Sequence, residues 1–184
     1  MEIEKRNPVI YLMCGKAKHG KDTFSGYLKA EYEKNGKKLI VTQLSKYIKY
    51  YAREMTGWDL SEETKPRELL QQLGTGVIRE YLQKDDLFIK RMIDDIDIFS
   101  CFYDAIVISD VRLKKEINDL KAVFPELKTV HIFRPNFDNG LTEEQKKHKT
   151  EIDLDDYEGY NIEIINTTLD KLEESAKEVY TKNN

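Results

Sequence analysis

The chain has few of the residues that crosslink small secreted domains, and it has no long apolar segment. Its 184 residues include only two cysteines, Cys14 and Cys101. Two cysteines are too few for a disulfide framework and are typical of the reducing cytoplasm, where we expect this protein to act. The apolar run at residues 9–14 is too short to span a membrane and does not have the pattern of a signal peptide, so we expect no membrane partner.

An excess of positive charge is also missing. Lys and Arg number 30 against 34 Asp and Glu, which gives a formal net charge of −4. This balance argues against bulk electrostatic binding to nucleic acid, so a polyanion would have to bind a local cluster of Lys and Arg. There are three histidines and no Cys-x-x-Cys pair. A zinc site is therefore not expected.

What the sequence does contain is an alternation of short apolar runs with amphipathic segments, and it shows no internal repeat. The apolar runs predict strands at 9–14, 38–44, 105–110, 129–135 and 161–167. The amphipathic segments predict helices at 21–36, 45–57, 65–82, 85–99 and 114–124, and one from about residue 168 to the C-terminus. This alternation predicts an α/β fold with a five-stranded, mainly parallel sheet.

The length of the chain fits a single domain over residues 1–184. One segment, 135–160, is heavily charged and weakly periodic. It predicts either a small lid or a solvated surface loop.

A glycine-rich loop lies between the first strand and the first helix. Gly15 and Lys21 bound the pattern Gly-x-x-x-x-Gly-Lys, which is the Walker A or P-loop pattern. In such a loop the backbone N–H groups surround phosphate oxygens at a helix N-terminus, and the lysine reaches the β- and γ-phosphates. We expect the nucleotide to be held by Gly15, Lys16, Ala17, Lys18, His19, Gly20, Lys21, Asp22 and Thr23.

Asp22 stands where most P-loops have the Ser or Thr that binds Mg²⁺, and a hydroxyl follows one residue later at Thr23. A carboxylate beside a triphosphate is tolerable if it faces Mg²⁺ and its waters. Alternatively, it only stabilises the start of the helix through the helix dipole. Thr23 can offer its hydroxyl and N–H groups to an α-phosphate.

The segment GKAKHGKDT resembles the loop of the phage-type deoxynucleoside monophosphate kinases and their bacterial relatives, which are P-loop kinases. Animal-type phosphomevalonate kinases have a similar Gly-Lys-Asp loop. Three further segments resemble motifs of the kinase family in the same order: KPRELLQQLGTGVIR (65–79), VISDVRLKKE (107–116), and HKTE (148–151) followed by IEIINTTLDKL (162–172). The chain departs from the family pattern at Thr150, where Ser is usual, and at Leu113-Lys114, where Phe-Pro is common.

The resemblance implies a three-layer P-loop NTPase fold with a small lid. It also implies an enzyme of nucleotide metabolism, a transferase that uses ATP and Mg²⁺ to convert a nucleoside or deoxynucleoside monophosphate to the diphosphate. The catalytic residues would be Lys21, Arg79, Arg112 and Asp110. Lys49, Arg67, Arg79, His148 and Glu151 would bind the substrate, Arg134 would lie near the nucleotide, and Asp22 and Asp110 would face the metal.

Without the resemblance, the sequence allows other roles for several of these residues. Arg67 and Arg79 would also suit exposed positions on a helix, and Asp110 could cap the helix that follows it. Arg112 could contact phosphate or pair with Asp110. Lys49 lies in a basic, tyrosine-rich helix that would either stack a base or pack its tyrosines in the core.

The function also has alternatives. The acceptor could be another small phosphorylated compound, such as one like phosphomevalonate, or the protein could be a nucleotide-binding regulatory module with little turnover. The sequence does not identify the preferred base or sugar. A homodimer is compatible with the family, but no stretch of the chain identifies an interface.

Overall fold

The computed structural model describes residues 4–184 and divides the chain into two compact units. Unit 1 contains the residues up to Gln43 together with Asp95–Asn184, and unit 2 contains Leu44–Asp94. Unit 1 holds the whole sheet and the glycine-rich loop, whereas unit 2 is helical. In the described part of the chain, no helix has the length and apolar character needed to cross a membrane.

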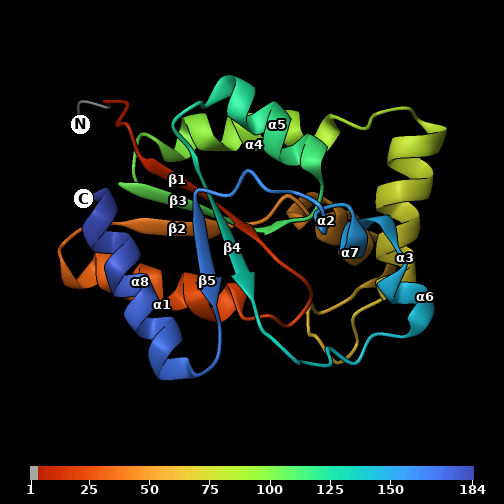
Figure 1. Ribbon diagram of the computed structural model, residues 1–184. Coiled ribbons are helices and arrows are strands. Elements are labelled where there is room, and N and C mark those ends of the chain that lie inside the picture. Colours follow the sequence, from red (N-terminus) through yellow and green to blue (C-terminus); the bar gives the residue numbers. More distant parts are fainter. Residues whose placement is uncertain (1–3) are drawn as a thin grey trace. The chain divides into compact units, whose positions relative to one another are not determined.

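Unit 1 is built on a five-stranded sheet in which every pairing is parallel. The strands lie in the order β2-β3-β1-β4-β5. Their bounds are Val9–Cys14 for β1, Leu39–Thr42 for β2, Ala105–Val111 for β3, Lys128–Phe133 for β4 and Ile162–Ile165 for β5. The predicted α/β fold with a five-stranded parallel sheet is therefore confirmed, and Figure 1 shows β1 at its centre.

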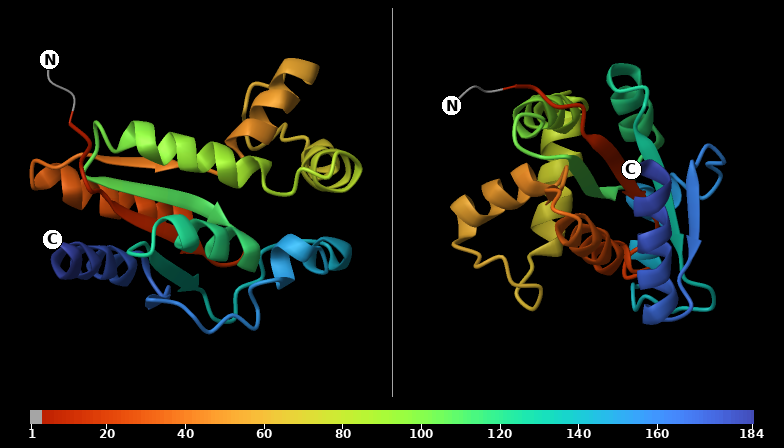
Figure 2. Two further views of the ribbon diagram at one scale, coloured as in Figure 1. Left: turned by 90° about the horizontal axis from the view of Figure 1, so that it is seen from above. Right: turned by 90° about the vertical axis from the view of Figure 1, so that its left-hand side faces the viewer.

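Helices cover both faces of this sheet. On one face α1 (Lys21–Lys34) lies beside α8 (Leu169–Asn183), and α5 (Lys114–Val123) lies on the opposite face (Figures 1 and 2). The core under α1 and α8 joins apolar side chains of all five strands to those of the two helices, among them Tyr11, Met13, Phe24, Leu28 and Leu172. Right-handed crossovers between parallel strands explain this division, because α1 leads towards one edge of the sheet and α5 leads towards the other.

The charged segment after β4 contains two short helices, α6 (Glu143–Lys146) and α7 (Lys149–Ile152). Thr142 caps α6 by accepting a hydrogen bond from the backbone N–H of Gln145 at 3.2 Å. His148 caps α7, since its Nδ1 accepts from the backbone N–H of Thr150 at 3.3 Å. Side-chain caps thus give local order to a segment whose sequence has little periodicity.

Unit 2 corrects one prediction about secondary structure. The helix expected over 65–82 is a short α-helix, α3 (Arg67–Gln71), that continues as a ten-residue π-helix, η1 (Gln72–Tyr81). Two glycines in η1, Gly74 and Gly76, bring no side chain that would resist the wider turn. A Cβ on Gly74 would lie 2.9 Å from Cδ1 of Ile48, which belongs to α2 (Lys46–Thr56). π-helices are rare, and the short ones found inside α-helices are frequently at functional sites.

The start of α5 excludes one of the two roles considered for Asp110, that of capping this helix. Asp110 lies inside β3, and Leu113 occupies the N-cap position of α5, so Asp110 does not cap that helix. Glu116 caps the start of the helix instead: its Oε2 accepts hydrogen bonds from the backbone N–H groups of Arg112 and Leu113 at 2.8 and 3.0 Å. The last helix that begins in unit 2, α4 (Leu87–Phe99), ends in unit 1.

Candidate functional site

The glycine-rich loop follows β1 closely over the ends of β4 and β5. Gly15 and Gly20 have φ angles of +136° and +103°, which L side chains rarely adopt. A Cβ on Gly15 would lie 2.4 Å from the carbonyl oxygen of Ile132, and one on Gly20 would lie 2.5 Å from Nδ2 of Asn166. Both glycines are therefore required by backbone angle and by space. Gly20 is also the N-cap of α1, so the loop leads into the positive end of that helix dipole.

Lys21 turns back into the loop. Its Nζ donates hydrogen bonds to the carbonyl oxygens of Gly15 and Lys16 at 2.7 and 2.9 Å, and the residue is only 7% exposed. Burial and the nearby Arg112 guanidinium lower the pKa of Lys21 to about 8. Three predicted site carboxylates oppose this shift, those of Asp22, Glu151 and Asp110. The structure thus brings these residues into one electrostatic neighbourhood around Lys21.

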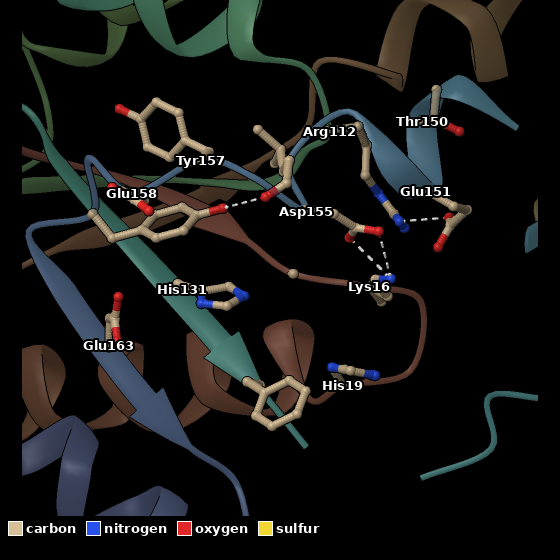
Figure 3. A pocket seen from close by; sticks show the side chains of 14 residues that line it. Lys16, His19, Arg112, His131, Thr150, Glu151, Asp155, Tyr157, Glu158 and Glu163 are labelled. Carbon is tan, nitrogen blue, oxygen red and sulfur yellow. Dashed lines mark hydrogen bonds and ion pairs between the residues drawn. The ribbon is translucent and has the colours of Figure 1, made fainter. Parts of the chain in front are cut away.

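Arg112 reaches the loop through Glu151. Its Nη1 donates to Glu151 Oε1 at 2.6 Å, and the other carboxylate oxygen of Glu151 accepts from the backbone N–H of Ala17 at 3.4 Å. Arg112 therefore pairs with a residue 39 positions away that belongs to the predicted lid segment. A loop amide and a predicted catalytic arginine therefore converge on one carboxylate. Figure 3 shows the contact between Arg112 and Glu151.

His19 fixes the other side of the loop. Its Nδ1 accepts a hydrogen bond from the backbone N–H of Arg134 at 3.2 Å, and its carbonyl oxygen accepts from Asn166 Nδ2 at 3.0 Å. Burial, with the charges of Lys21 and Lys16, lowers the pKa of His19. The guanidinium of Arg134 stacks over Phe137, 4.0 Å from the ring centroid. The loop is thus joined to the chain after both β4 and β5.

A pocket of about 400 Å³ opens beside the loop on the face of the sheet opposite α1 and α8 (Figure 3). Gly15, Lys16 and Arg112 line one end of it, and His131 and Glu163 line the other. Side chains alternate along β4, so Val130 and Ile132 enter the core while His131 faces the pocket. His131 stacks on Tyr160 with ring centroids 4.5 Å apart.

The predicted metal-facing residues, Asp22 and Asp110, both raise the pKa of Lys21 and so lie near its ammonium group. Within residues 4–184 there is no group of three or more His, Cys, Asp and Glu side chains that could hold a metal ion by itself. Two carboxylates, completed by phosphate oxygens and water, form the donor set that Mg²⁺ commonly takes in phosphotransferases. The residues present therefore fit Mg²⁺ bound together with a nucleotide.

The remaining predicted cations belong to unit 2. Arg79 lies in η1, where its Nη1 donates to the Gly74 carbonyl at 3.5 Å and its guanidinium lies 5.7 Å from the Phe88 ring centroid. Arg67 begins α3 and pairs with Glu62 at 2.7 Å. Lys49 lies half-buried in α2. Their role as acceptor ligands stays a prediction.

Some residues of the site did not stand out in the sequence. Asp155 pairs with Lys16 at 2.9 Å, Asn166 contacts the loop, and Tyr160 stacks in the pocket. Asn166 had a signal, because it lies at the end of the fifth predicted strand, where the strand ends of a parallel sheet meet ligands. Asp155 is one of four acidic residues in the segment 151–156. Nothing in the sequence distinguishes it from the other three.

Comparisons with known proteins identify a family from the sequence and a fold from the structure. The sequence model of the family described as deoxynucleotide monophosphate kinase matches residues 37–176. Among solved structures, an APS kinase of Mycobacterium tuberculosis superposes with a TM-score of 0.54 at 9% identity, covering 96% of each chain. A sugar kinase from Janibacter sp. gives a TM-score of 0.55 at 12% identity, covering 92% of each chain. At such identities the likeness concerns the fold, and it confirms the three-layer P-loop fold. No curated protein sequence matches the chain significantly.

Proposed function

The chain belongs to the deoxynucleotide monophosphate kinase family, and from this we propose that it transfers the γ-phosphoryl group of ATP to a nucleoside or deoxynucleoside monophosphate, giving the diphosphate. The family and the fold support a phosphotransferase. The observation that carries phosphoryl transfer is the loop itself, in which Lys21 is buried beside Arg112 and two carboxylates suited to Mg²⁺. The family match supports a nucleotide as the acceptor.

The donor site is the loop of unit 1. Backbone N–H groups at the start of α1 would surround the phosphates of ATP, and Lys21 would leave its carbonyl partners to contact the β- and γ-oxygens. Mg²⁺, oriented by Asp22 and Asp110, would neutralise part of the charge on the donor phosphates. Incoming phosphate also stabilises the protonated form of Lys21, which opposes the effect of burial on its pKa.

The reaction needs no side-chain nucleophile, because an oxygen of the acceptor phosphate attacks the γ-phosphorus. The protein has to position the two substrates, neutralise charge on the transferred group and exclude water. Lys21 and Arg112 are the cations of unit 1 suited to the second task. A guanidinium can meet two equatorial phosphoryl oxygens at once.

We assign binding of the acceptor phosphate to Lys49, Arg67 and Arg79 of unit 2. The contact of Arg79 with Gly74 and its stacking on Phe88 restrict the rotamers of its guanidinium, so less entropy is lost when phosphate binds.

The experiment that tests the proposal measures ADP release from ATP and Mg²⁺ with a panel of ribo- and deoxynucleoside monophosphates, and phosphomevalonate as a non-nucleotide acceptor. We expect at least one monophosphate to stimulate release, and Lys21→Ala to lower kcat roughly a hundredfold or more, because this contact strengthens as charge develops. If only phosphomevalonate stimulates ADP release, the acceptor is not a nucleotide and the proposed substrate is wrong. Tight ATP binding with no stimulation by any acceptor would indicate a regulatory module.

Arg79→Ala tests the acceptor assignment. We expect the KM for the monophosphate to rise roughly tenfold or more while the affinity for ATP is largely kept. The matched control is Arg53→Ala, which removes an exposed arginine of α2 in the same unit and should change neither constant. If Arg79→Ala weakens the binding of ATP as much as that of the monophosphate, the assignment is wrong.

A further inference from the structure

The segment that follows α6 places a series of carboxylates on the cations around the loop. We define residues 149–157 as the acidic strap; it starts with α7 and carries Glu151, Asp153, Asp155 and Asp156. Each of the four makes a contact with a positive or N–H group in the region of the loop or the start of α5. Figure 3 shows two of these pairs, Lys16 with Asp155 and Arg112 with Glu151, on the same side of the loop.

Glu151 occupies a position suited to a phosphate group. Its two oxygens accept from the backbone N–H of Ala17 at 3.4 Å and from the Arg112 guanidinium at 2.6 Å. A loop amide and an arginine that converge on one anion are the groups that a phosphoryl group of the donor would need. A carboxylate has the charge and the oxygen acceptors to replace it.

The other strap carboxylates hold the segment in place. Asp155 pairs with Lys16 of the loop at 2.9 Å, Asp153 accepts from the backbone N–H of Lys114 at 2.7 Å, and Asp156 pairs with the Lys114 ammonium at 2.6 Å. The side chains of Lys16 and Asp155 are 45% and 49% exposed, whereas those of Arg112 and Glu151 are 25% and 13% exposed. Solvent therefore screens the Glu151 contact least, and this contact should dominate the competition.

We propose that the acidic strap is an internal competitor of polyphosphate: Glu151 fills the anion position formed by Ala17 and Arg112, and a triphosphate binds only when the strap leaves it. The inference rests on the loop being the donor site of the proposed function. It assigns the strap the opposite effect from that of a lid which only closes over bound phosphates.

The strap lowers the apparent affinity of the loop for polyphosphate according to the fraction of molecules in which Glu151 contacts Ala17 and Arg112. When only a fraction of the molecules has an open loop, the apparent dissociation constant equals the intrinsic constant divided by that fraction. Neutralising Glu151 weakens the closed state and raises the open fraction. It should therefore tighten polyphosphate binding, and the loss of repulsion between the Glu151 carboxylate and the phosphates acts in the same direction.

The test titrates inorganic tripolyphosphate into the metal-free protein by calorimetry and compares wild type with Glu151→Gln. We expect the variant to bind roughly three- to tenfold tighter, since the ion pair with Arg112 is replaced by a weaker hydrogen bond to an uncharged amide. The matched control is Glu143→Gln, which makes the same change of charge in α6, where Glu143 contacts Lys146. Its affinity should stay close to that of wild type. Weaker binding by Glu151→Gln would overturn the inference.

Hydrogen exchange on the wild-type protein provides a second test that needs no variant. We expect saturating tripolyphosphate to protect the loop amides and, at the same time, to speed exchange in 149–157 as the strap is displaced. Increased protection of 149–157 would mean closure over the ligand and would overturn the inference. If wild type binds tripolyphosphate and Glu151→Gln binds no tighter, the strap inference alone fails. If neither protein binds it, the donor site of the proposed function fails, and the inference fails with it.

Discussion

The Nδ1 atom of His19 accepts a hydrogen bond from the backbone N–H of Arg134 at 3.2 Å. An imidazole that accepts at Nδ1 carries its proton on Nε2 and is neutral, in agreement with the lowered pKa of this buried ring. Protonation of Nδ1 would break the bond between the loop and the chain after β4. The contact is therefore sensitive to acid.

We expect the wild-type protein to lose stability between about pH 7 and pH 5, with part of the loss due to His19. Because its pKa is lowered on folding, the unfolded chain binds more protons than the folded chain in this range, so the free energy of unfolding decreases as the pH falls. In His19→Asn an amide oxygen can replace Nδ1 as acceptor without titrating, and the decrease should be smaller. Urea unfolding at both pH values measures it. His131, whose pKa is also lowered, remains in both proteins and accounts for part of the decrease in each. An equal decrease in the free energy of unfolding for wild type and His19→Asn would show that His19 does not contribute to it.

The pKa of about 8 for Lys21 predicts an alkaline limit on donor binding. As the pH rises through about 8 the free loop loses its buried cation, so kcat/KM for ATP should fall. The decline of kcat should occur at higher pH, since bound phosphates raise the pKa of the ammonium group. Lys21→Arg keeps a positive charge throughout this range. Its affinity for tripolyphosphate should show no decline at the pH where that of wild type does, and a matching decline would assign the limit to another group.

Gly20 and Gly26 form a matched pair for the loop geometry. Gly20→Ala forces an L side chain to φ +103° and against Asn166, and should destabilise the protein by about 1–3 kcal/mol and raise the KM for ATP. Gly26 lies inside α1, where an added Cβ would meet open space. Gly26→Ala should stabilise the helix by up to about 1 kcal/mol and leave the KM unchanged. Thermal unfolding and kinetics of both variants check this, and a neutral Gly20→Ala would contradict it.

Asp22 is exposed in the first turn of α1, where it could contact the water shell of Mg²⁺ or only stabilise the helix dipole. Asp22→Ser separates these roles when ADP release is measured across Mg²⁺ concentrations. We expect the half-saturating Mg²⁺ concentration to rise several-fold, because a carboxylate attracts the ion more strongly than a hydroxyl. An unchanged metal requirement with a slightly lower melting temperature would assign Asp22 to the helix alone.

The sequence predicted the sheet well because five short apolar runs alternate with amphipathic segments, and burial on both faces makes such runs conspicuous. The loop was equally clear, since Gly15 to Lys21 form a local pattern whose spacing reflects its geometry. The π-helix was not predicted, because a shift from i+4 to i+5 hydrogen bonds leaves almost no trace in the order of residues.

Contacts between distant residues were harder to find. Glu151 was predicted to bind substrate, but its pairing with Arg112, 39 residues away, depends on how the segment after α6 returns over the loop. Asp155 and Lys16 are 139 residues apart and meet for the same reason. Periodicity describes one element at a time, so it identifies the strands but not which charges lie against each other.

The position of β1 at the centre of the sheet also determines when the loop can form during synthesis. Val9 pairs with Ala105 and Tyr11 with Lys128, and the two loop glycines pack against Ile132 and Asn166. At about 5–20 residues per second, the ribosome needs many seconds to add those partners after it has made the loop. A nascent chain that stops before Asn166 would contain every residue of the Walker A pattern but would lack the side chain that donates to the His19 carbonyl. The loop therefore reaches its full set of contacts only after residue 166 has been added.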